Sequence, residues 1–238
     1  MKSKLFLSIS LVILLSFSLC ANASVKYLGS DRTTQGDWVG KYGANGVIIF
    51  CNKDNHNANL PVPYNIDETQ KLAKKGLISE LSITGSGTGQ AAYGWIFNAT
   101  PGDAKNALWL VDKSARYAAC ISGRNADVAM TLKVDSTHYK VTIYCTDYDT
   151  TARAYQAFGY QGNTIPAQPD EEINKYTNGI YTSWEVTGSD PFKYLGKNLA
   201  PSVNNVASGL FIDDMGAVSS VQSNDKLPSV WGHIKDMP

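Results

Sequence analysis

Apolar residues fall on alternate positions along much of the chain, and this period of two is typical of β-strands. The alternation is clearest over Ala126–Val134 and again over Tyr139–Cys145. The short polar segment Asp135–His138 lies between them, so we expect these two strands to pair as a hairpin. Leu77–Ile83 and Ile180–Val186 show the same pattern and are expected to be half-buried strands.

Further short apolar runs are separated by clusters of Gly, Asn, Asp and Pro, which mark turns. They are Val47–Phe50, Gly94–Phe97, Ala107–Val111, Tyr117–Ile121, Arg153–Phe158 and Val206–Ile212. So many short strands favour an all-β fold, a two-sheet antiparallel β-sandwich. One short helix in a loop is predicted over Glu68–Lys75, because Asp67 can cap it and Gly76 can end it. The long segment Gly159–Gly179, between two predicted strands, is expected to lie on the surface.

The first 23 residues have the features of a cleavable secretory signal peptide. Lys2 and Lys4 precede a short apolar core interrupted by serines, and Ala21-Asn22-Ala23 matches a signal-peptidase site. We therefore expect 1–23 to be a signal peptide, 24–214 to be the β-sandwich domain and 215–238 to be a loosely ordered tail. Such a protein would be secreted, extracellular or periplasmic. A lipoprotein anchor on Cys20 is the less favoured alternative, because the residue before it is Leu19.

The charge composition and the lengths of the apolar runs exclude two classes of partner, nucleic acid and the membrane interior. The chain has 21 basic and 21 acidic residues, and cleavage would remove two lysines. A balanced charge of this kind gives no electrostatic footprint for nucleic acid. Apart from the signal core, every apolar run has the length of a strand, so we expect no membrane span.

Three cysteines would survive cleavage: Cys51, Cys120 and Cys145. An odd number leaves at least one unpaired, so we expect at most one intramolecular disulfide, with Cys120–Cys145 as the favoured pairing. No Cys-x-x-Cys pair occurs and the three histidines are far apart in sequence, so a zinc site is not indicated.

The stretch DRTTQGDWVGKYGANGVIIF, Asp31–Phe50, combines four glycines with Trp38 and Tyr42. Glycines permit positive φ and close backbone approach, which suits a tight entrance into a sheet. A phosphate loop would need Gly-Lys-Ser/Thr before a helix, whereas Gly40-Lys41-Tyr42 leads into a predicted strand. We favour a structural role for this stretch over a ligand-contacting one.

Several separated blocks of the sequence are similar to a known module when taken in order. These blocks are Thr33–Trp38, Tyr42-Gly43, Gly46, Arg116, Cys120, Val141–Asp149, Arg153 and Ser208–Phe211. Together they resemble a β-sandwich module of secreted bacterial surface proteins that also occurs appended to glycoside hydrolases. The resemblance covers about Asp31–Asp213 and implies a jelly-roll-like fold with carbohydrate-binding-like character. The chain departs from that pattern at Ile121, where the module usually has an aromatic residue.

The strongest polar constellation is Asp147-Tyr148-Asp149 with Arg153 four residues later. Two carboxylates at the end of a strand could bind Ca²⁺ or accept hydrogen bonds from sugar hydroxyls. The alternative, which we favour, is that the aspartates cap the following turn and pair with Arg153. Asp147 and Asp149 are thus the candidate metal ligands, and Ca²⁺ is the only candidate cofactor.

No catalytic motif is evident, and nothing selects a carboxylate pair for glycoside hydrolysis. The function that best fits the sequence is therefore non-enzymatic binding of an extracellular polysaccharide or glycan through exposed aromatic residues. Alternatives are a structural or adhesive extracellular protein and, less favoured, a glycoside-active enzyme. The candidate ligand-binding residues are Trp38, Tyr42, Asp147, Tyr148, Asp149 and Arg153.

Overall fold

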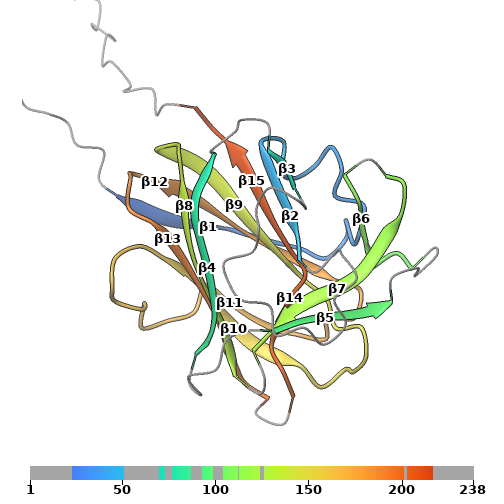
Figure 1. Ribbon diagram of the computed structural model, residues 1–238. Coiled ribbons are helices and arrows are strands. Elements are labelled where there is room, and N and C mark those ends of the chain that lie inside the picture. The colour runs from blue at the N-terminus through green and yellow to red at the C-terminus, as the bar shows by residue number, and fades with distance from the viewer. Residues whose placement is uncertain are drawn as a thin grey trace, which may run out of the picture.

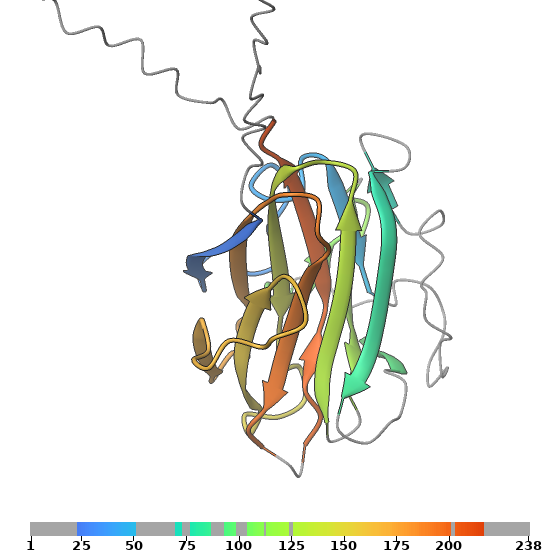
Figure 2. The same ribbon diagram turned by 90° about the vertical axis from the view of Figure 1, so that its left-hand side faces the viewer.

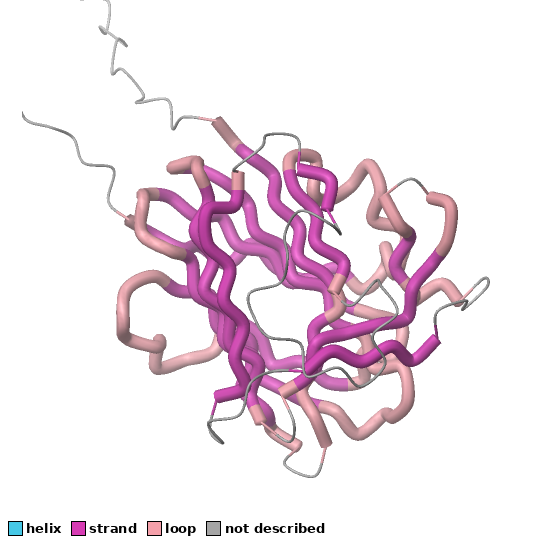
Figure 3. Tube along the Cα trace, in the orientation of Figure 1, coloured by secondary structure: helices cyan, strands magenta, loops and turns pink. Residues whose placement is uncertain are grey.

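The computed structural model describes residues 23–50, 70–72, 77–86, 93–98, 104–111, 113–123, 126–200 and 203–216. The described residues form β-strands and loops without a helix (Figure 3). They therefore include no helix long and apolar enough to cross a membrane. The predicted signal peptide, Cys51 and the predicted tail beyond residue 216 lie outside the described residues.

The strands form three sheets, and all neighbouring strands within each sheet pair in the antiparallel direction (Figure 1). The all-β, antiparallel class predicted from the sequence is confirmed. The six-stranded sheet has the order β1-β12-β9-β15-β2-β3. Its strands are β1 (Ser24–Asp31), β2 (Gly46–Ile49), β3 (Gln70–Leu72), β9 (His138–Cys145), β12 (Ile180–Thr187) and β15 (Gly209–Asp214).

The five-stranded sheet has the order β11-β10-β13-β8-β4, and Figure 2 shows β13, β8 and β4 side by side. Its strands are β4 (Ile78–Ser86), β8 (Asp127–Val134), β10 (Ala154–Tyr160), β11 (Glu171–Asn174) and β13 (Phe192–Asn198). The third sheet has the order β14-β7-β5, and β6 pairs with β7. It comprises β5 (Tyr93–Asn98), β6 (Leu108–Trp109), β7 (Arg116–Ser122) and β14 (Val206–Ala207).

The predicted hairpin between Ala126–Val134 and Tyr139–Cys145 is wrong, although both strands exist. β8 pairs with β13 and β4, whereas β9 pairs with β12 and β15 in the other large sheet. The segment Asp135–Thr137 thus carries the chain from one sheet to the other. Each strand still buries one face in the shared core, and that requirement produces the same alternation in both arrangements.

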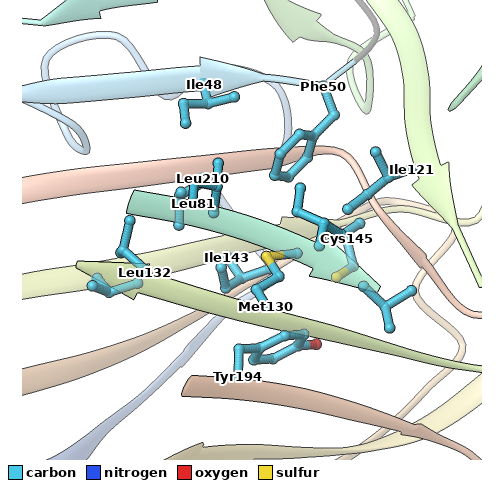
Figure 4. Close-up of a cluster of buried hydrophobic side chains, with 14 of the residues drawn as sticks. Ile48, Phe50, Leu81, Ile121, Met130, Leu132, Ile143, Cys145, Tyr194 and Leu210 are labelled. Carbon is cyan, nitrogen blue, oxygen red and sulfur yellow. The ribbon is translucent and has the colours of Figure 1, made fainter. Parts of the chain in front are cut away.

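The main core draws apolar side chains from all three sheets. In Figure 4, Met130 and Leu132 of β8 lie close to Ile143 of β9 and Leu210 of β15. A second cluster lies on the other face of the six-stranded sheet and contains Trp38, Val47, Ile49, Leu108, Tyr144, Tyr181 and Phe211. β12, expected to be half-buried, consequently has buried residues on both faces over Ile180–Trp184.

The predicted Cys120–Cys145 disulfide is wrong. The two cysteines lie in different sheets, on β7 and at the end of β9, and no disulfide joins them. Both side chains are buried in the core. Burial raises the pKa of the Cys145 thiol to about 12, because a thiolate there would lose its hydration.

Strands occur in two regions where the sequence did not predict them, the expected short helix and the expected surface segment. Of the helix expected over Glu68–Lys75, the described residues are Gln70–Leu72, which form β3 at the edge of the six-stranded sheet. Their backbone groups pair with β2, and the rest of that helix lies outside the described residues. The long segment Gly159–Gly179 is exposed over 162–168, but it then forms β11 and buries Ile173 and Tyr176 in the main core.

Candidate functional site

The connection between β9 and β10 places the Asp147–Asp149 pair around one guanidinium group. Arg153 Nη1 donates to the Oδ1 atoms of both aspartates. Its Nε donates to the backbone oxygen of Asn204 at 2.7 Å, which ties the connection to the loop before β14. The Thr150 amide donates to Asp147 Oδ1 at 3.1 Å. The interpretation that these aspartates cap a turn and pair with Arg153 is therefore confirmed.

The three charged side chains differ sharply in exposure. The side chain of Asp147 is 1% exposed and that of Arg153 is 6% exposed, whereas that of Asp149 is 50% exposed. Burial raises the pKa of the Asp147 carboxyl, although Arg153 acts in the opposite direction. Burial also acts to lower the pKa of Arg153, but the two carboxylates outweigh it and raise that pKa. Asp147 and Arg153 thus form a buried ion pair, and Asp149 extends from it to the surface.

A cavity of about 210 Å³ lies against this ion pair, where the small sheet meets the β9–β10 connection. It has room for about seven water molecules at roughly 30 Å³ each, so it could hold one small ring. Its lining residues are Phe97, Cys120, Ser122, Asp149, Arg153, Asn204 and Val206. Tyr148 stands behind the aromatic wall, because its ring packs against that of Phe97 with the centroids 5.1 Å apart. We call this the Asp149 cavity.

Two polar groups of the Asp149 cavity have unused hydrogen-bonding capacity. The hydroxyl of Ser122 is buried and has no hydrogen-bond partner among the described residues. Within the same part of the chain, Asp149 bonds only Arg153 and does so through Oδ1, which leaves Oδ2 able to accept. A buried hydroxyl without a partner carries a desolvation cost, and a ligand or water that bonds it would relieve that cost.

Trp38 and Tyr42 lie in a different cavity, of about 240 Å³, beside β2. Trp38 is only 3% exposed, so it is not the exposed aromatic expected from the sequence. Its ring packs on Phe211 with the centroids 5.1 Å apart, and its Nε1 donates to the Trp109 backbone oxygen at 2.8 Å. Tyr42 stacks on Tyr181 at 4.4 Å. Both aromatic side chains are thus held by internal contacts.

Several polar side chains around the second cavity have partners within the protein. Tyr42 donates its hydroxyl to Asp31 Oδ2 at 2.8 Å, and Lys41 donates to the Thr34 hydroxyl at 3.0 Å. Asp213 accepts from the Ala44 amide at 2.7 Å and lies 3.0 Å from Lys140 Nζ. Asp213 Oδ2 is buried and has no hydrogen-bond partner among the described residues, but its ion pair with Lys140 compensates its charge.

Asp31 organises the stretch Asp31–Phe50. Its Oδ1 accepts from the Thr33 amide and hydroxyl, both at 2.7 Å, and its Oδ2 accepts from Thr34 and Tyr42. Burial acts to raise the pKa of Asp31, but hydrogen bonds from Thr34 and Thr33 outweigh it and hold that pKa well below its usual range. The predicted structural use of this stretch agrees with these contacts.

Gly36 and Arg116 join the same stretch to residues 104–111. A Cβ on Gly36 would lie 1.9 Å from the Ala107 oxygen, so only glycine fits there. Arg116 donates to that same oxygen at 2.8 Å and to Asp37 at 2.6 Å. Its guanidinium also lies 4.2 Å from the ring centre of Trp109.

The structure therefore divides the six candidate residues between two places. Asp149 and Arg153 line one cavity, with Asp147 and Tyr148 directly behind it. Trp38 and Tyr42 line the other. Sequence reasoning missed Phe97, Ser122 and Asn204, because each belongs to a strand or loop far from the aspartates in sequence and carries no motif.

Neither a metal cluster nor a known family identifies the site. Among the described residues, no group of three His, Cys, Asp or Glu side chains could hold a metal ion. No family model matches the chain. No curated protein matches it either.

Among solved structures, the chain is similar to the carbohydrate-binding module TmCBM61 in complex with β-1,4-galactotriose. The two are 11% identical, and the match covers 59% of this chain and 92% of that chain with a TM-score of 0.20. A TM-score this low carries no argument about the site.

Proposed function

We propose that this chain is an exported, non-enzymatic, glycan-binding protein, and that the Asp149 cavity receives one sugar unit. The finer fold expected from the sequence, a jelly-roll-like two-sheet β-sandwich, forms part of this proposal. The observation that carries it is the buried hydroxyl of Ser122, which has no partner among the described residues and lies at a cavity of about 210 Å³. Export is supported by the predicted signal peptide, whose cleavage would make Ser24 the first residue.

The chemistry of the lining suits a sugar. Phe97 offers an aromatic surface for the apolar face of a pyranose ring. Asp149 Oδ2 can accept from a sugar hydroxyl, and the Ser122 hydroxyl can both donate and accept. Ligand sites are commonly apolar hollows with a few such polar groups.

The test uses a matched pair of serine variants. Both Ser122 and Ser208 have a buried hydroxyl without a partner among the described residues, but only Ser122 lines the Asp149 cavity. Ser122→Ala and Ser208→Ala should both leave the melting temperature almost unchanged, because removing an unsatisfied hydroxyl costs little. Affinity electrophoresis should be run on a panel of soluble plant, algal and microbial polysaccharides.

On a retarding polysaccharide, Ser122→Ala should weaken binding by about 1 kcal/mol, or about fivefold, the value of one hydrogen bond. Ser208→Ala should bind like wild type. If the polysaccharide retards Ser122→Ala as strongly as Ser208→Ala, the Asp149 cavity is not the binding site. Retardation by none of the polysaccharides would favour the structural or adhesive alternative.

A further inference from the structure

The charge at the Asp149 cavity is unbalanced. Asp149 and Arg153 are the charged residues among its described lining, and the buried Asp147 stands directly behind Arg153. Two carboxylates against one guanidinium leave one negative charge in excess. Because Asp147 is almost fully buried while Asp149 is half exposed, the excess charge resides at Asp149 and faces solvent and the cavity.

The two aspartates already compensate the charge of Arg153. Its Nη1 donates to both carboxylates and its Nε donates to the Asn204 oxygen, whereas Nη2 has no hydrogen bond to a described residue. A ligand carboxylate that approached Nη2 would also meet the uncompensated negative charge of Asp149. Like charges placed together in this way disfavour binding.

We infer that the Asp149 cavity selects by charge, and that it binds a 2-amino sugar more tightly than the neutral sugar and the uronic acid more weakly than the neutral sugar. This inference rests on the proposed function of the same cavity. A sugar ammonium can form a charge-assisted hydrogen bond with Asp149 Oδ2, which the described part of the chain leaves without a partner. The ring then lies toward Phe97, and a hydroxyl reaches Ser122.

The expected selectivity is moderate, because Asp149 is half exposed to solvent. At about 4 Å in water-like surroundings, the interaction of two unit charges corresponds to about a fivefold change in affinity. We therefore expect glucosamine to bind about fivefold more tightly than glucose, and glucuronate to bind about fivefold more weakly than glucose. Added salt should narrow both differences.

The test is a calorimetric or NMR titration of the full chain with glucosamine, glucose and glucuronate at pH 6 and constant ionic strength. Asp149→Asn keeps the shape of the side chain and removes its charge, so it should bring the three affinities close together. Glu172→Gln is the control, because Glu172 is exposed on β11 and does not line the cavity. This variant changes the net charge by the same amount and should keep the wild-type order.

Each outcome decides something. The order glucosamine, glucose, glucuronate in the wild type, lost in Asp149→Asn, supports the inference. Equal affinities, or a preference for glucuronate, overturn the charge selection and leave the proposed glycan function standing. A preference that persists in Asp149→Asn overturns the role of Asp149. Binding of none of the three sugars overturns the inference, whereas the proposed glycan function is decided separately by retardation on the polysaccharide panel.

Discussion

Replacing Arg153 tests the buried ion pair on which the geometry of the Asp149 cavity depends. Arg153→Met keeps the bulk of the side chain but leaves the Asp147 carboxylate, 1% exposed, without its counter-charge. Breaking a buried pair from one side costs about 3–5 kcal/mol, because the remaining charge stays buried and unpaired. In a domain of this size, 1 kcal/mol corresponds to about 2–4 °C, so we expect the melting temperature to fall by about 6–20 °C.

Two companion variants make the measurement specific. Asp149→Asn removes the half-exposed partner of Arg153 and should cost less than about 1 kcal/mol, as solvent-exposed pairs do. In Arg153→Met/Asp147→Asn the buried charge is gone, so part of the lost stability should return. Thermal unfolding followed by circular dichroism measures all four proteins.

The same perturbation has a pH signature. Burial raises the pKa of Asp147 in the folded protein, and removal of Arg153 eliminates the interaction that opposes this rise. A carboxyl with a raised pKa stabilises the fold only while it is protonated, and that stability disappears as the pH increases. The deficit of Arg153→Met should therefore be largest at neutral pH and should narrow toward pH 4. An Arg153→Met protein as stable as wild type, or no more affected than Asp149→Asn, would refute the reasoning.

Four further predictions follow from the other contacts. If the predicted signal is cleaved, mass spectrometry of the exported protein should find Ser24 at the N-terminus, and intact Met1 would contradict this. Asp31→Asn should lower the free energy of unfolding at neutral pH by at least about 1 kcal/mol. Because the folded pKa of Asp31 is lowered, its contribution is fully present above the unfolded pKa of about 4, declines below it and is lost only as the pH falls through the folded pKa, as equilibrium denaturation at several pH values would show. Gly36→Ala should destabilise the fold more than Gly40→Ala, since a Cβ at Gly36 meets the Ala107 backbone oxygen, whereas one at Gly40 has open space and meets only the strain of a positive φ; equal melting temperatures would contradict the close approach. A calcium role for Asp147 and Asp149 predicts a higher melting temperature in Ca²⁺ than in chelator, whereas their pairing with Arg153 predicts equal curves.

Local features of the fold could be predicted from the sequence because they depend on neighbouring residues. The alternation that located β8 and β9 arises within each strand. The pairing of Asp147 with Arg153 spans six residues and needed only a turn at the end of a strand. The pairing between distant strands could not be predicted, because the same alternation of apolar residues occurs whether two consecutive strands form a hairpin or lie in different sheets. β13 was missed altogether, although its Phe192, Tyr194 and Leu195 are buried.

The Asp149 cavity could not be predicted for the same reason. Its wall combines Phe97 of β5, Ser122 of β7 and Asn204 with the β9–β10 connection, and only the pairing of β7 with β5 and β14 brings them together. None of these residues stands in a motif. That the Ser122 hydroxyl has no partner among the described residues likewise follows from the packing and not from a sequence motif.

The most direct test of the glycan-binding claim is to map the bound sugar onto the structure. Isotope-labelled protein would be titrated with a soluble oligosaccharide derived from a polysaccharide that retards it, and amide chemical shifts would be followed by NMR. We expect the largest changes at Ser122, Asp149 and Asn204, around the Asp149 cavity. Changes confined to Trp38 and Tyr42, or a spectrum unchanged at saturating sugar, would contradict the account.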